Sequence, residues 1–258
     1  FNAGTPDVSA DVFLTIGDVQ LSGNASFALV KRTVTADIDG AGNGALLTNA
    51  DLLTMALQVS GVGVHVGNTA HLTVSGNLAV ASLTPSQTPA PDARNWTALK
   101  MGDVVVTGNV NLGLSDIDAE FTVAALDLNS ASTGTARLDW TTAFDFDADG
   151  NNDLVNPGSA LPVPVDLTID FTAGIELRLR GGASIDLADG SAVAVIPTGG
   201  LELQIATMDV VSGDPTIGTL AGARVLSFNV TNASLFLGSG GALSGNRQSV
   251  VTDADALG

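Results

Sequence analysis

The sequence of 258 residues contains no cysteine, and this absence excludes several kinds of structure and chemistry. Without thiols the chain has no disulfides, no thiolate metal site and no cysteine nucleophile. Aromatic residues are also scarce, at 4% of the chain, and tyrosine is missing. Hydrophobic residues still account for 45% of the chain. The apolar content is therefore mostly aliphatic, which suits many thin strands and tight turns better than an aromatic-lined pocket.

Basic residues are few: nine Lys and Arg stand against 27 Asp and Glu, for a net charge of −18. Nucleic acid is excluded as a partner because no basic stripe can displace counterions from phosphates, and an anionic membrane surface is disfavoured for the same reason. No apolar run reaches the roughly 18 residues of a membrane helix, so we expect no membrane span. The only glutamates are Glu120, Glu176 and Glu202. The remaining acidic residues are Asp, which favours turns and binds cations in loops.

Alternation of apolar and polar residues dominates the chain and predicts an all-β protein. The clearest runs cover residues 53–66, 117–125, 163–171, 175–179 and 201–207, and residues 138–144 are strand-like as well. Gly61 predicts a bend in the first run, and a change of phase predicts a bulge near Ala125. We expect the Val, Leu and Ile positions of these strands to form the buried face and the polar positions to face solvent.

A short unit recurs along the chain, in which a small polar residue and Asn interrupt the alternation. Ser22-Gly23-Asn24, Ser75-Gly76-Asn77 and Thr107-Gly108-Asn109 each stand between apolar strand residues, and residues 228–237 form a looser copy. Each step is either a hairpin turn or a kink within a long strand. Self-similarity of this kind predicts an elongated antiparallel β-solenoid or stacked β-sandwich repeats, in which units bury apolar faces against their neighbours.

Two Pro-rich stretches break the strand pattern and predict surface loops. The first covers residues 84–95, and the second lies within residues 151–164. We expect residues 1–258 to form one continuous β-repeat region, with subdivision into 1–84 and 96–258 as the alternative. The chain starts at Phe1 without a visible signal peptide, so we expect it to be a piece of a longer protein.

The sharpest local motif is an Asp-rich loop over residues 145–153, which fits D-x-D-x-D-G-x-x-D. Carboxylates at alternate positions converge on one cation, and the glycine allows the sharp turn between them. The predicted calcium ligands are side-chain oxygens of Asp145, Asp147, Asp149 and Asp153 and the backbone oxygen of Asn151. Position twelve is Asn156 rather than Glu, and no helix precedes the loop, so it is not an EF-hand. The alternative is that the four carboxylates point apart into solvent.

Other candidate sites are weaker. His65 and His71 flank a predicted hairpin tip without a nearby carboxylate, which favours exposed turn residues over a metal site. Asp116 and Asp118 could form a catalytic carboxylate pair, but they occupy the polar phase of a strand. The acidic loop at residues 37–44 is short of ligands. Trp96 and Trp140 are expected to anchor the β core. These observations predict a protein that is not an enzyme.

The Ser-Gly-Asn strand units, the strand entry at residues 95–100 and the Asp loop at residues 145–153 resemble the repeat regions of very large, Asp-rich bacterial extracellular proteins of the adhesin type, often exported by type I secretion. The resemblance covers about half of the chain. It implies secretion, a surface or matrix location and calcium-dependent rigidity. The tandem G-G-x-G-x-D repeats of a calcium β-roll are missing, so that fold is not expected.

These features predict a non-enzymatic structural or adhesive module of a bacterial surface, fibre or matrix, stiffened by calcium. Its expected partners are neighbouring copies or other repeats of the same protein, and surface polysaccharide. Open edge strands would allow pairing with adjacent units. The alternatives are a polysaccharide-active enzyme on a β-scaffold and a lipid- or ligand-binding β-groove, the latter favoured by the long alternating strands.

Overall fold

The computed structural model describes residues 10–16, 19–39, 45–66, 70–86, 91–111, 116–187, 190–214, 216 and 218–257. Its secondary structure consists of strands and one short 3-10 helix, so the expected all-β class is confirmed. The elements are β1 (Ala10–Ile16), β2 (Val19–Asp37), β3 (Leu46–Val66), β4 (Ala70–Thr84), β5 (Trp96–Asn111), β6 (Asp116–Ala131), η1 (Pro157–Ala160), β7 (Ile175–Leu187), β8 (Ala192–Val211), β9 (Thr219–Val230), β10 (Ser234–Leu237), β11 (Ser239–Leu243) and β12 (Val250–Leu257). Across these ranges no helix is long and apolar enough to cross a membrane.

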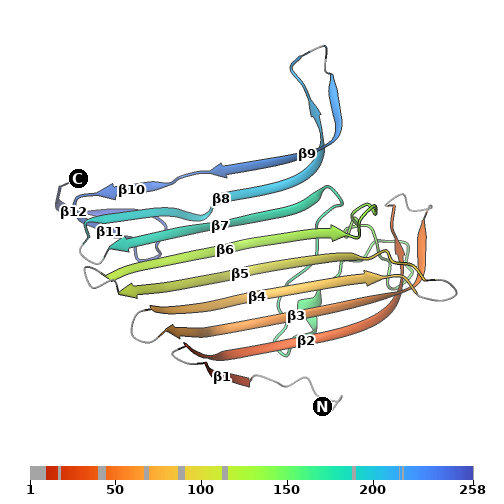
Figure 1. Ribbon diagram of the computed structural model, residues 1–258, viewed down its shortest axis with the longest axis horizontal. Coiled ribbons are helices and arrows are strands. Elements are labelled where there is room, and N and C mark those ends of the chain that lie inside the picture. The colour runs from red at the N-terminus through yellow and green to blue at the C-terminus, as the bar shows by residue number, and fades with distance from the viewer. Residues whose placement is uncertain are drawn as a thin grey trace.

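Ten strands form one antiparallel sheet in which chain neighbours are also spatial neighbours, as Figure 1 shows. The order runs from β1 to β8, and β9 and β10 pair with two different parts of β8. Pairing continues across the first Pro-rich loop, where Leu83 of β4 lies opposite Trp96 of β5. Strands β11 and β12 form a separate hairpin.

One face of the sheet is covered by residues 132–174, which we call the cover segment. In Figure 1 it runs in green behind the sheet. Its buried side chains are Leu138, Trp140, Ala143, Phe144, Val155, Pro157, Leu161, Leu167, Ile169 and Phe171. The strands predicted over residues 138–144 and 163–171 are wrong, because this segment crosses the sheet instead of pairing within it. Its only β pairing is an isolated bridge between Val155 and Ile169.

The sheet positions beneath the cover segment are mostly alanine. Fully or nearly fully buried here are Ala28, Ala36, Ala50, Ala56, Ala79, Ala81 and Ala98. Small side chains are needed because the cover segment contributes Trp, Phe, Leu and Ile to a layer of limited thickness. Trp96 from the sheet and Trp140 from the cover segment are 1% and 0% exposed. Their predicted role as core anchors is confirmed.

A line of irregular positions crosses the long strands. Pairing shifts register at Gly23 in β2, at Gly61 in β3 and at Gly76 in β4. Two copies of the Ser-Gly-Asn unit are therefore bulges within strands, while Gly108 of the third copy continues regular pairing. Gly76 has φ +147°, and a Cβ there would lie 2.7 Å from Val104 Cα, so the bulge requires glycine. The predicted bend at Gly61 and bulge near Ala125 are both confirmed.

Candidate functional site: an aspartate loop and an exposed apolar sheet face

Three of the predicted calcium ligands lie together in the cover segment. Asp145, Asp147 and Asp149 each offer a carboxylate oxygen, and these oxygens lie within 4.8 Å of one another. All three side chains are exposed. Carboxylate oxygens are the ligand type that calcium prefers.

The loop is also organised by its own backbone. Ala148 and Gly150 have positive φ values of 60° and 88°, which turn the chain sharply. The turn aims the N–H groups of Asp149 and Gly150 at the carboxylate of Asp145, at 3.2 and 3.0 Å. Hydrogen bonds from the Asn151 side chain and backbone to the Asp149 carboxylate hold the pKa of Asp149 below its usual value. Donors within the loop thus offset part of the repulsion between its carboxylates.

The structure does not bring all five predicted ligands together. Asp153 lies outside the carboxylate group, and its Oδ2 accepts a hydrogen bond of 2.6 Å from the backbone N–H of Phe146. The side-chain amide of Asn151 donates to Asp149 Oδ2 at 2.9 Å. Asp153 therefore closes the base of the loop here, and the backbone-oxygen role of Asn151 stays a prediction.

The weaker candidate sites have different surroundings. His65 and His71 lie opposite each other on β3 and β4, but their side chains are outside the described part of the chain. The same holds for the side chain of Asp116, and residues 40–44 of the second acidic loop are also outside it. Asp118 accepts a hydrogen bond of 2.6 Å from Arg247 Nη1, so it takes part in an ion pair.

A row of large apolar side chains runs across eight strands on the face opposite the cover segment. Register pairs each member with the next, from β2 to β9: Phe27, Leu57, Leu78, Met101, Leu126, Leu179, Leu203 and Phe228. None of these side chains is buried, and the two terminal phenylalanines are 48% and 65% exposed. A continuous apolar ridge therefore faces outward.

A second row lies beside the first, two residues along each strand. It consists of Leu29, Met55, Val80, Leu99, Leu128, Leu177, Ile205 and Leu226. None of these eight side chains is buried either. The two rows together are called the apolar band. The expectation that large apolar positions form the chain's own buried face is wrong for the band, because the cover segment packs on the opposite, alanine-rich face.

The apolar band is large for an exposed surface. Strands about 4.8 Å apart, with same-face residues about 6.8 Å apart along each strand, give it a footprint of roughly 34 by 14 Å, or about 500 Å². The largest apolar patch on a typical monomer measures about 300–600 Å² and is often functional. Beside the bulge at Gly76, Val59, Val74 and Val104 form an apolar hollow with band residues Leu57, Leu78 and Met101. The apolar surface therefore extends past the bulge line.

Charged side chains occupy the opposite, covered face. Arg178 Nε donates to Asp127 Oδ2 at 2.7 Å, and Asp127 is completely buried. Lys100 lies opposite Asp127 in the register and pairs with Asp170 of the cover segment at 2.7 Å. Ion pairs thus lie beside the apolar core on the covered face, over the middle of the sheet.

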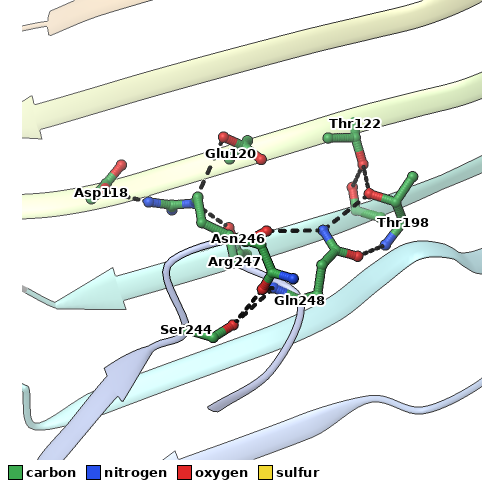
Figure 2. Close-up of polar contacts among 10 residues, drawn as sticks. Asp118, Glu120, Thr122, Thr198, Ser244, Asn246, Arg247 and Gln248 are labelled. Atoms are coloured by element: carbon green, nitrogen blue, oxygen red, sulfur yellow. Dashed lines mark hydrogen bonds and ion pairs between the residues drawn. The ribbon is translucent and has the colours of Figure 1, made fainter. Parts of the chain in front are cut away.

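The β11–β12 hairpin is fastened to the same covered side by its connecting loop (Figure 2). Arg247 donates to Ser184 Oγ at 3.0 Å and to Asp118 Oδ2 at 2.6 Å, and it lies 3.7 Å from Glu120. Gln248 accepts a hydrogen bond of 2.7 Å from the backbone N–H of Thr198. These contacts join β6, β7 and β8 to the hairpin, so we assign Arg247 a structural role.

Comparison with known proteins gives no relative: no family model, no curated protein and no solved structure matches the chain. Function therefore has to be argued from the molecule itself. Sequence reasoning missed the apolar band. The alanines clustered on the opposite phase of β3 to β5 (Ala50, Ala56, Ala79, Ala81 and Ala98) were the available signal, because a face of small residues leaves room for a covering layer.

Proposed function

We propose that this protein is a non-enzymatic structural or adhesive module of an extracellular surface, fibre or matrix, which assembles through its sheet and is stiffened by calcium. The apolar band carries the proposal. Binding sites for small molecules are concave and place a few polar groups among apolar ones. The band is broad, runs the width of the sheet and consists of apolar residues only, which suits association with another protein surface.

The proposed architecture follows from the same feature. A single open sheet with one bare apolar face is half of a β-sandwich, because stacked sheets pack face to face about 10 Å apart. Stacking of such units would give the β-sandwich repeats predicted from the sequence. High negative charge elsewhere on the chain would keep the assembled surface soluble.

Assembly can be measured directly by sedimentation velocity from 1 to 200 µM protein. We expect a concentration-dependent species heavier than the 25.8 kDa chain. A single monomer peak throughout this range, at both low and high salt, would contradict the assembly proposal.

Calcium would act on the cover segment. The Asp loop directly follows Phe144, a core residue that is 1% exposed, and the backbone N–H of Asp153 donates to the Phe144 carbonyl at 2.7 Å. A cation held by Asp145, Asp147 and Asp149 would therefore rigidify a loop tied to the core. At 100 times its Kd, calcium stabilises the folded state by about 2.7 kcal/mol, which corresponds to a rise in Tm of roughly 5–10 °C.

The calcium test compares thermal unfolding in excess calcium and in chelator. The double variant Asp147→Ala/Asp149→Ala is expected to lose the calcium-dependent rise in Tm. The matched control Asp253→Ala/Asp255→Ala removes two charges from an exposed Asp-x-Asp pair on β12 and is expected to keep it. Equal melting curves with calcium and chelator in the unmodified protein would remove calcium from the proposal.

A lipid-binding surface is the second candidate, and the apolar band favours it as well. The net charge of −18 opposes binding to anionic bilayers, and the band contains no Lys or Arg to attract them. Flotation with neutral phosphatidylcholine vesicles tests whether the apolar band binds lipid. Co-flotation of the protein, lost in Leu126→Asp, would favour lipid over protein as the occupant of the band.

A further inference from the structure

We propose that the apolar band binds the same band of a second copy of this chain, so that two sheets pack face to face about a two-fold axis. This inference rests on the proposed structural function and names its partner. Three observations carry it: the symmetry of the first row, the size of the band and the distribution of charge.

The first row has nearly the same sequence of side-chain sizes in both directions. Phe27 stands at one end and Phe228 at the other, with only Leu and Met between them. A two-fold interface brings one surface patch against itself, so a patch must be self-complementary. With the axis parallel to the strands, Phe27 of one copy lies over Phe228 of the other. Two twisted sheets separate toward their corners, and the larger phenylalanines fill that wider gap.

The size of the band matches the requirement of a stable dimer. Each sheet position covers about 33 Å², so the sixteen band residues together with Leu53, Val59 and Val74 give about 630 Å² per copy. Two copies would bury about 1,250 Å², and stable interfaces bury roughly 1,200–2,000 Å². Apolar burial on this scale offsets the entropy lost on association when the packing is complementary.

Charge favours a second protein sheet over a charged partner. The band holds no charged side chain, although the chain carries 27 acidic residues. At one corner of the sheet Lys31 pairs with Asp51 at 3.0 Å, so the charges nearest that end of the band compensate each other. Two copies of net charge −18 repel at long range, and salt screens this repulsion. Dimerisation through the band is therefore expected to strengthen with salt, whereas an interface of ion pairs would weaken.

The first experiment measures the dimer dissociation constant by sedimentation at 50 and 500 mM NaCl. We expect at least a tenfold tighter dimer at the higher salt. Leu126→Asp places a charge at the middle of the band and is expected to weaken the dimer at least about 100-fold, because an unpaired charge would be buried. Val163→Asp adds the same charge to an exposed residue of the cover segment (68% exposed) and is expected to leave the dimer unchanged. Circular dichroism of both variants confirms folding.

The second experiment uses the absence of cysteine. Leu126 lies beside the centre of the row, so a two-fold axis through the centre places it near its own copy. Leu126→Cys is expected to cross-link with a short bis-maleimide, and Val163→Cys is not. Assembly that persists in Leu126→Asp without cross-linking at residue 126 would overturn the face-to-face dimer and leave the structural function standing. A monomer at every salt and concentration would overturn both.

Discussion

Asn129 of β6 connects the sheet to the cover segment, and replacing it provides a sharp test of how the two layers are held together. The side chain is completely buried. Its Nδ2 donates to the carbonyls of Leu138 and Thr172 at 2.8 and 3.2 Å, and its Oδ1 accepts from Trp140 Nε1 at 3.1 Å. One amide thus satisfies polar groups at both ends of the segment.

The variant Asn129→Ala leaves the Trp140 N–H and the Leu138 carbonyl buried without their partner. Each unsatisfied group costs about 1–3 kcal/mol, and the lost side-chain volume adds a small cavity. We expect the free energy of unfolding to fall by about 4 kcal/mol, out of a total of about 5–15 kcal/mol for a typical protein. This corresponds to a decrease in Tm of roughly 8–16 °C.

Urea denaturation followed by tryptophan fluorescence is the appropriate assay, because both tryptophans, Trp96 and Trp140, are buried in this core. Asn229→Ala on the exposed surface of β9 is the control, and its stability is expected to stay within about 0.5 kcal/mol of the unmodified protein. If the two variants unfold at the same urea concentration, Asn129 does not hold the cover segment and the reasoning fails.

Two further predictions concern charged groups. Arg178→Met leaves Asp127 buried without its cation, and we expect a loss of about 3–5 kcal/mol in urea denaturation; Arg180→Met, which breaks an exposed pair with Glu202, is expected to lose at most about 1 kcal/mol. Hydrogen bonds from Arg224 hold the pKa of Glu176 below its usual value, with a smaller contribution from the charge of Arg137. A lowered pKa in the folded state means that the stabilisation is present above the unfolded pKa of about 4.3 and is lost as pH falls through the folded pKa. The stability difference between the unmodified protein and Glu176→Gln is therefore expected to shrink as the pH falls below about 4.3 and to vanish only below the folded pKa of Glu176. A difference that stays constant throughout acid denaturation would contradict the assignment.

Alternation predicted most strands correctly because residues two apart share a side of any extended chain. It failed for residues 138–144 and 163–171, which alternate equally well but lie across the sheet. Period-two patterning reports side-chain direction and carries no information on whether a neighbouring backbone is within hydrogen-bonding range. Gly61 and the phase change near Ala125 were more informative, since a bulge changes the phase locally.

The Asp loop shows a similar limit. Spacing alone predicted that Asp145, Asp147 and Asp149 would converge, and the structure places their oxygens within 4.8 Å. Spacing did not predict that Asp153 would accept the Phe146 N–H. Backbone donors compete with a cation for every carboxylate, and their positions depend on the turn geometry at Ala148 and Gly150, which the motif does not specify.

The two faces of the sheet are packed differently. This difference explains why polar groups lie on the covered face. Most buried sheet positions on the covered face are alanines, with Leu52, Leu83 and Trp96 as the large ones, so apolar contact alone fixes the position of the cover segment weakly. Asn129, the Lys100–Asp170 pair and the hydrogen bond from Trp96 Nε1 to the Ala136 carbonyl at 2.9 Å fix its position. The buried contacts of Asn129 in particular favour one arrangement over others, because misplacement leaves them unsatisfied. The apolar band has large side chains of distinct shape, and complementary shapes can set the register of a partner without polar contacts. An apolar face with side chains of such distinct shapes is therefore suited to bind the same face of a second copy.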